Sequence, residues 1–165
     1  MIVEKLVVGF LKTNCYIVYS PDNRGCAVID PGGESRRICA DLEKRGLTPD
    51  VILLTHAHAD HVRGLWHLYE KTGACVYVHA GELDARINIG PFRFVPPPKT
   101  QYVCEGSTIC AGSLRFSVLE CPGHTPGSVV YRCEDTLFTG DTLLHMGSGR
   151  VDYPCSSRED MIASL

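Results

Sequence analysis

The chain is organised around the stretch Thr55-His56-Ala57-His58-Ala59-Asp60-His61, which places three imidazoles and one carboxylate within six residues. It directly follows residues 51–54, an apolar run typical of a buried strand. His56 and His58 are two positions apart, so an extended exit from that strand points both rings the same way. Imidazole nitrogens and carboxylate oxygens are ligands that zinc accepts. The stretch therefore predicts a divalent-metal site at the carboxyl end of a strand.

Two further loops carry residues of the same chemical kind. His124 stands in residues 121–128, a loop rich in Pro and Gly, and Asp141 follows a short strand predicted at 136–139. Binding sites are commonly built where loops converge at one edge of a scaffold. The sequence thus supplies six candidate metal ligands on three loops, namely His56, His58, Asp60, His61, His124 and Asp141.

Length and composition indicate a single globular domain. The chain has 165 residues, of which 44% are hydrophobic and 21% charged, and its net charge is −3. No basic cluster indicates nucleic-acid binding, and no apolar run approaches the length of a membrane span. The first residues alternate like a strand rather than a signal peptide. We therefore expect a cytoplasmic protein with no nucleic-acid or membrane partner; the oligomeric state stays open.

The nine cysteines do not form a recognisable framework. Their number is odd, and no pair has the C-x-x-C spacing of a thiolate zinc site. We expect them to be free and mostly buried, packing as small apolar side chains in a reducing cytoplasm.

Hydrophobic periodicity and turn residues divide the chain into short elements. Strands are predicted at residues 2–8, 14–19, 25–30, 51–54, 75–78, 101–104, 107–110, 113–119, 129–133 and 136–139. Helices are predicted at 34–45, 65–71 and 80–87, with a loop over 88–100 and a last helix starting after an N-cap at Ser157. The pattern indicates an α/β fold with mixed sheets and helices outside.

At this point the sequence resembles the metallo-β-lactamase fold, an αββα sandwich with a metal site at one edge. The resemblance rests on residues 55–61, on Pro-Gly-His-Thr-Pro-Gly at 122–127 and on Phe-Thr-Gly-Asp at 138–141. Within that fold the chain is similar to the glyoxalase II-like (hydroxyacylglutathione hydrolase-like) branch, which has a Gly-Arg-x-Asp element like residues 149–152. We expect Arg150 and Asp152 to pair and to be structural.

The resemblance implies a metal-dependent hydrolase with a small-molecule substrate, a thioester such as acylglutathione. His56, His58 and His124 would hold one metal, Asp60 and His61 would help hold a second, and Asp141 would bridge both. The cofactor would be one or two zinc ions, with iron as the alternative. Asp60 is the expected catalytic residue, orienting the nucleophilic water, and the metal-bound hydroxide would attack the carbonyl.

One departure from the family pattern keeps other functions open. The family has a further His ligand in a Gly-His loop after the Asp, whereas here only His145 follows, between Leu144 and Met146. We therefore expect residues 1–165 to form one domain that lacks the C-terminal part of the fold. A mononuclear iron persulfide dioxygenase, using His56, His124 and Asp141, is one alternative. A metal-binding remnant without turnover is another, and a β-lactamase is less favoured because an export signal is not recognised.

Overall fold

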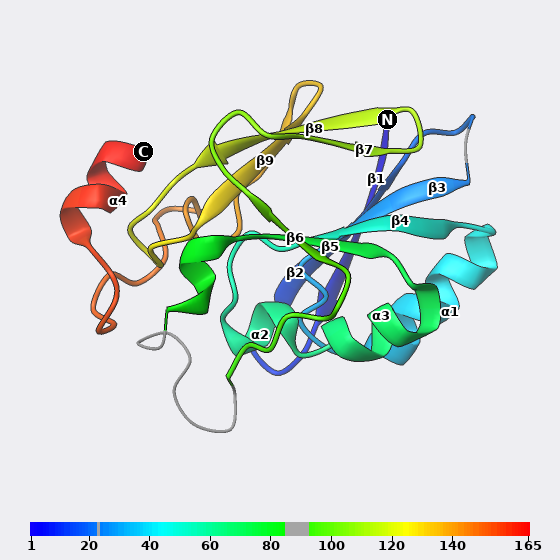
Figure 1. Ribbon diagram of the computed structural model, residues 1–165, viewed down its shortest axis with the longest axis horizontal. Coiled ribbons are helices and arrows are strands. Elements are labelled where there is room, and N and C mark those ends of the chain that lie inside the picture. The colour runs from blue at the N-terminus through cyan, green and yellow to red at the C-terminus, as the bar shows by residue number, and fades with distance from the viewer. Residues whose placement is uncertain (23, 85–92) are drawn as a thin grey trace.

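The first of two β-sheets contains the strands that lead into the predicted metal site. The computed structural model describes residues 1–22, 24–84 and 93–165 (Figure 1). In spatial order the first sheet consists of β1 (Ile2–Val8), β2 (Thr13–Tyr19), β3 (Gly25–Ile29), β4 (Thr48–Leu53), β5 (Cys75–His79) and β6 (Thr100–Val103). Strands β1 to β3 pair antiparallel, whereas β3 to β6 pair parallel.

The helices α1 (Ser35–Arg45) and α3 (Leu65–Thr72) connect the parallel strands and cover one face of this sheet (Figure 1). Helix α1 buries Ile38 and Leu42 against the sheet and ends at Gly46, whose φ of 66° is a conformation that favours glycine. A short helix, α2 (Ala59–Val62), begins directly after the first two histidines. The predicted helices at 34–45 and 65–71 are confirmed within a residue.

The second sheet is antiparallel throughout and packs on the other face of the first. Its spatial order is β10 (Thr136–Phe138), β9 (Val129–Cys133), β8 (Leu114–Glu120) and β7 (Thr108–Ala111). Strand β4 shows why both layers are needed. Ile52 belongs to the core beneath the helices, while Val51 and Leu53 belong to the core between the two sheets. Alternate side chains of a strand point to opposite faces, so a strand buried on both faces is apolar throughout.

Three sequence predictions differ from the structure. Strand β4 begins at Thr48 rather than at residue 51 and includes Pro49, where the pairing with β3 shifts register. The predicted helix at 80–87 is instead a 3₁₀ helix, η1 (Ala80–Leu83). Residues 85–92, which include the first five residues of the loop predicted at 88–100, lie outside the described part of the chain. The second sheet is antiparallel and not mixed.

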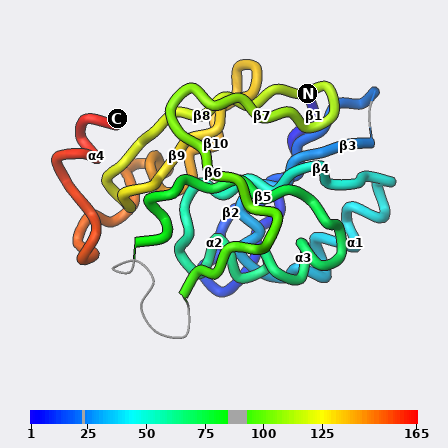
Figure 2. The backbone as a smooth tube through the Cα atoms, in the orientation of Figure 1, coloured from blue at the N-terminus to red at the C-terminus, as the bar shows by residue number. Residues whose placement is uncertain are grey.

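The last helix, α4 (Arg158–Ser164), lies beside the end of the second sheet, away from α1 and α3 (Figure 2). The hydroxyl of Ser157 accepts a hydrogen bond from the Asp160 N–H at 3.1 Å, which confirms the predicted N-cap. The Ser157 N–H donates to the Gly123 carbonyl at 2.8 Å, and the Ser164 hydroxyl donates to the Pro122 carbonyl at 2.8 Å. The helix is therefore attached to the loop that carries His124.

All nine cysteines are free, as predicted. Five of them are buried, whereas Cys104 and Cys110 are exposed and Cys39 and Cys155 are partly buried. Among the described residues, the helices are too short or too polar to cross a membrane.

Candidate metal centre

The site forms where the end of β4 meets loops of the second sheet. The Val129 N–H donates to the Thr55 carbonyl at 2.9 Å, and the Tyr131 hydroxyl donates to the Leu54 carbonyl at 3.0 Å. Strand β9 is thereby fixed against the chain that leaves β4. Since His56 and His58 follow directly on one side, and His124 precedes β9 on the other, these bonds bring the predicted ligands together.

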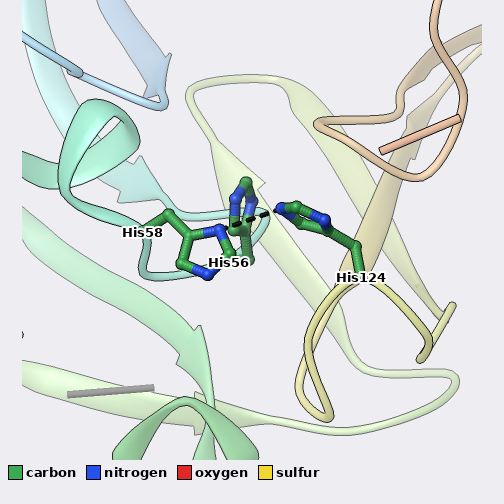
Figure 3. A group of neighbouring side chains, drawn as sticks. All are labelled: His56, His58 and His124. Carbon is green, nitrogen blue, oxygen red and sulfur yellow. Dashed lines mark hydrogen bonds between the residues drawn. The ribbon is translucent and has the colours of Figure 1, made fainter. Parts of the chain in front are cut away.

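Three histidines form the first group of candidate ligands (Figure 3). One ring nitrogen from each of His56, His58 and His124 lies within 4.8 Å of the others. The His58 Nδ1 and His124 Nε2 atoms are 2.9 Å apart, and the ring centroids of His56 lie 4.9 Å from those of both partners. The structure therefore brings together the three residues that the resemblance assigns to one metal.

Hydrogen bonds on the far side of the rings orient two of these histidines. His124 Nδ1 lies 2.8 Å from the Arg150 carbonyl oxygen, which can only accept, so Nδ1 carries the proton and Nε2 has the lone pair. The Thr55 hydroxyl donates to the Asp30 carboxylate at 2.7 Å, so its oxygen accepts from His56 Nδ1 at 3.1 Å. His56 Nε2 therefore presents a lone pair to the interior.

The environment of His56 Nε2 tests whether a cation fits this group. The nitrogen is buried and has no hydrogen-bond partner among the described residues. Buried polar atoms are nearly always paired, and an orphaned lone pair that faces two other imidazoles fits a metal ion. The donor set of three neutral imidazoles suits zinc as well as iron.

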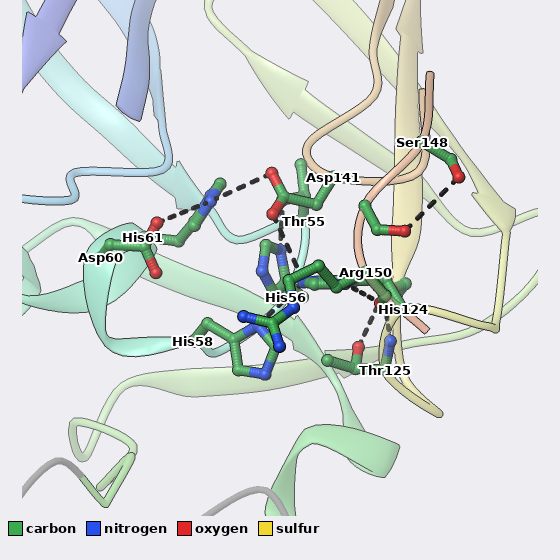
Figure 4. A network of polar contacts seen from close by, with 12 residues as sticks. Thr55, His56, His58, Asp60, His61, His124, Thr125, Asp141, Ser148 and Arg150 are labelled. Atoms are coloured by element: carbon green, nitrogen blue, oxygen red, sulfur yellow. Dashed lines mark hydrogen bonds and ion pairs between the residues drawn. The ribbon is translucent and has the colours of Figure 1, made fainter. Parts of the chain in front are cut away.

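A second group consists of His56, His61 and Asp141 (Figure 4). His61 Nδ1 lies 3.0 Å from the Asp30 carboxylate, and its Nε2 lies 3.4 Å from Asp141 Oδ1. The other Asp141 oxygen lies 3.3 Å from His124 Nε2. Asp141 thus belongs to the second group and also faces His124 of the first, as a bridging ligand would.

Asp60 is at the margin of the second group rather than a member of it. Its Oδ2 lies 3.5 Å from His61 Nε2 and accepts a hydrogen bond from the Thr13 hydroxyl at 3.1 Å. The side chain is 30% exposed and lines the cleft above the site. Five of the six predicted ligands therefore fall in the two groups, and the assignment of Asp60 as a ligand stays a prediction.

The charges of the site differ sharply between the two groups. Burial, followed by the neighbouring histidines, holds the pKa of His56 well below its ordinary value and lowers that of His58 to about 4. Burial also opposes the charge of His61, but Asp30 and Asp141 outweigh it and raise the His61 pKa to about 10. His56 and His58 are consequently neutral at pH 7, whereas His61 carries a proton between two carboxylates.

Two buried carboxylates support the site, although neither was among the predicted ligands. Asp30 accepts hydrogen bonds from the Thr55 N–H at 2.8 Å and the Thr55 hydroxyl, and it also contacts His61. Its φ of 49° is unusual for a residue other than glycine but is tolerated by Asp. The second, Glu82, is completely buried in η1. Only the sequence position of Asp30, at the end of a buried strand and before Pro31, could have indicated its role.

A cleft of about 1000 Å³ opens above the two groups. Its lining includes Lys12 and Arg150, which are cationic, and Leu143, which is apolar. The Arg150 guanidinium makes two hydrogen bonds to Asp152, at 2.9 and 2.8 Å, which confirms the predicted pairing. The guanidinium also lies 4.8 Å from the centre of the Tyr153 ring. Arg150 is therefore held at the mouth of the cleft.

The histidines without an assigned role are outside both groups. His145 lines the cleft but joins neither group of candidate ligands in the described chain. His79 Nδ1 accepts from the Gly81 N–H at 3.1 Å, and its Nε2 lies 3.2 Å from Glu120. His67 Nδ1 is buried without a partner among the described residues, next to a groove between α1 and α3.

The two-sheet fold with a histidine and aspartate cluster at one edge defines a metallo-hydrolase scaffold. The chain belongs to the metallo-beta-lactamase superfamily, whose sequence model matches residues 8–165. The superfamily and the fold predicted from the sequence are therefore confirmed.

Two curated relatives cover nearly the whole chain. The chain is 36% identical over 172 residues to "Probable metallo-hydrolase YqgX" of Bacillus subtilis (strain 168), covering 98% of this chain and 81% of the relative. It is 31% identical over 181 residues to "Hydroxyacylglutathione hydrolase GloC" of Haemophilus influenzae (strain ATCC 51907 / DSM 11121 / KW20 / Rd), covering 100% of this chain and 82% of the relative. The predicted glyoxalase II-like relatives are thus found.

Solved structures with the same fold carry different names, and one of them is described with two irons. "BLEG-1 B3 metallo-beta-lactamase" is 32% identical with a TM-score of 0.86, covering 99% of this chain and 83% of that chain. TTHA1623 "in a di-iron-bound form" is 32% identical with a TM-score of 0.84, covering 99% and 84%. ETHE1 from Myxococcus xanthus is 30% identical with a TM-score of 0.85, covering 99% and 68%. The shared fold therefore does not by itself determine the metal or the substrate.

Proposed function

We propose that the chain is a zinc-dependent hydrolase of thioesters such as acylglutathione. The observation that carries the proposal is the buried His56 Nε2, which has no partner among the described residues and faces His58 and His124. The similarity to a hydroxyacylglutathione hydrolase of Haemophilus influenzae supports the substrate class. Arg150 and Lys12 line the cleft and can attract the carboxylates of an anionic thiol carrier.

The residues of the chain divide the work of such a hydrolysis. His56, His58 and His124 would hold the first cation, and Asp141 and His61 would hold a second beside it. When bound, the cations supply a hydroxide at neutral pH and polarise the thioester carbonyl. Asp60, partly exposed in the cleft and held by Thr13, would accept a hydrogen bond from the attacking water and orient it.

The assay follows thiol release from an acylglutathione by the purified, metal-loaded protein. The proposal expects turnover that is lost on chelation and restored by zinc. A protein that contains zinc but leaves acylglutathione, acyl-coenzyme A and other small thioesters intact would contradict the substrate class. Hydrolysis of a β-lactam alone would assign the β-lactamase reaction instead, and metal binding without any turnover would indicate a remnant.

A mononuclear iron persulfide dioxygenase is the second candidate. It is favoured by the two imidazoles and one carboxylate of His56, His124 and Asp141, a donor set typical of non-haem iron oxygenases. His124 Nε2 lies 3.3 Å from Asp141, and the similar TTHA1623 has been solved with two irons. Iron in the purified protein, with oxygen uptake on addition of glutathione persulfide and no thioester hydrolysis, would favour this function.

A further inference from the structure

Glu82 connects the two loops that carry the first group of histidines. The residue lies in η1, and its side chain is completely buried. One carboxylate oxygen, Oε2, accepts a hydrogen bond from the Ala57 N–H at 2.6 Å. The other, Oε1, accepts from the Thr125 hydroxyl at 2.6 Å and from the Gly127 N–H at 3.1 Å. A single carboxylate therefore holds residues from both sides of the site.

The positions of these partners relate Glu82 directly to the ligands. Ala57 stands between His56 and His58, and Thr125 follows His124. The backbone of the first loop and the Thr125 side chain of the second loop are thus both hydrogen-bonded to the Glu82 carboxylate. We propose that Glu82 is a positioning residue for the first metal site, setting the separation between His58 and His124. The inference rests on the proposed metal site but not on the identity of the substrate.

Close packing leaves the Glu82 carboxylate little freedom to move. A Cβ at Gly127 would lie 2.7 Å from Glu82 Oε1 and 2.8 Å from the Glu82 backbone nitrogen, so a larger residue would displace the carboxylate or the loop. A Cβ at Gly81 would lie 3.0 Å from the Gly127 Cα. The backbones of η1 and of the loop after His124 are therefore in contact, and the hydrogen bonds to Glu82 are made at a fixed distance.

The chemistry of the contacts explains why a carboxylate is required. The backbone N–H groups of Ala57 and Gly127 can only donate, and the Thr125 hydroxyl can rotate to donate as well. A carboxylate has two acceptor oxygens and satisfies all three donors. An amide has one acceptor oxygen and one donor nitrogen, so in Glu82→Gln at least one N–H would face another donor.

The test measures metal affinity in the full-length Glu82→Gln protein. Zinc affinity is determined by competition with a chromophoric chelator, and the geometry is followed by the visible spectrum of the cobalt-substituted protein. Removing a partner that orients metal ligands typically costs about 10- to 100-fold in metal affinity. We expect a loss of that size for the first zinc, together with a shifted cobalt spectrum, in a protein that remains folded by circular dichroism.

A matched control is available in Asp50, whose carboxylate also accepts a backbone hydrogen bond between two elements. Its Oδ2 accepts from the Gly112 N–H at 2.7 Å, outside the loops that carry the ligands. Asp50→Asn is expected to change stability at most and to leave zinc affinity and the cobalt spectrum unchanged. Equal losses in both variants would mean that the effect is general destabilisation and would overturn the proposal.

Thr125→Val provides a second variant if Glu82→Gln does not fold. It removes one of the three donors and preserves the shape of the side chain, so a smaller loss of zinc affinity with the same direction of spectral shift is expected. A folded Glu82→Gln protein, or failing that a folded Thr125→Val protein, with wild-type affinity and spectrum would overturn the proposal. Failure of the wild type to bind zinc or cobalt would overturn the metal site itself, whereas zinc binding without thioester hydrolysis would refute only the proposed substrate.

Discussion

The Nδ1 atom of His58 lies 2.9 Å from the Nε2 atom of His124, although 66 positions separate the two residues in the sequence. His124 Nε2 carries a lone pair because its other nitrogen donates to the Arg150 carbonyl. The nearby His56 Nε2 is buried without a partner among the described residues. Such a concentration of imidazole nitrogens is understandable if a cation occupies the space that they face.

The first prediction concerns the residues that hold this cation. Replacing His56 and His124 together by Ala should abolish tight metal binding, because two of the three nitrogens of the first group are removed. Elemental analysis after gel filtration measures the metal content. His145→Ala serves as the control, since His145 lines the cleft but belongs to neither group of candidate ligands. Unchanged metal content in the double variant would refute the assignment.

The second prediction concerns Asp60 as the residue that orients water. Asp60→Asn keeps the size of the side chain and removes its charge. If Asp60 orients the nucleophile or holds a second metal, kcat should fall by a factor on the order of 10² or more. Steady-state kinetics with a thioester measures the effect, and metal analysis of the same sample distinguishes the two roles. Full activity in this variant would exclude Asp60 from the mechanism.

The ligands could be predicted from the sequence because they occur in local motifs. Residues 55–61 place four of them within six positions after a buried strand, a loop rich in Pro and Gly marks His124, and Asp141 directly follows a short predicted strand. The resemblance to a known fold then supplied their convergence, which single motifs cannot establish. The structure agrees by bringing five of the six into two groups.

The supporting carboxylates could not be predicted, because their partners are set by the tertiary fold. Glu82 stands in a stretch predicted as a longer helix, where Glu would ordinarily face solvent, but its donors come from residues 57, 125 and 127.

Strand β4 is longer than predicted because Pro49, which is disfavoured inside sheets, nevertheless lies within it. The strand accommodates Pro49 through the register shift between Cys26 and Ala27 of its neighbour.

The third prediction concerns the acid stability of the metal-free protein. The folded-state pKa of His58 is about 4, mainly because of burial, whereas an unfolded His has a pKa near 6.5. The stability that His58 contributes is therefore fully present above about pH 6.5 and is lost as the pH falls towards 4. The slope from this one group is at most about 1.4 kcal/mol per pH unit. The free energy of unfolding of wild type and of His58→Asn, measured with denaturant at several pH values, should differ by an amount that changes across this window. A difference that stays constant with pH would contradict the lowered pKa.

The last prediction concerns the proton that His61 carries between Asp30 and Asp141. Burial lowers the His61 pKa, but these two carboxylates raise it to about 10, so the metal-free protein holds the proton at pH 7.5. A metal that binds His61 Nε2 must displace this proton, because a ligating imidazole needs its lone pair. By contrast, His58 is already neutral at that pH. Binding to the second group should therefore release about one proton, and its affinity should rise about tenfold per pH unit below pH 10.

Calorimetric titrations in buffers of different ionisation enthalpy count the protons released by each metal ion. His61→Asn is the matched variant, since it keeps a polar side chain of similar reach but cannot carry the proton. We expect the wild type to release about one proton more than this variant when both metals bind. Suppose instead that the wild type binds two metals at pH 7.5 without releasing a proton. In that case either His61 is not a ligand, or His61 is not protonated in the metal-free protein. Binding of a second metal with unchanged affinity in His61→Asn would identify the first of these two explanations, because the variant removes the ligand together with the proton.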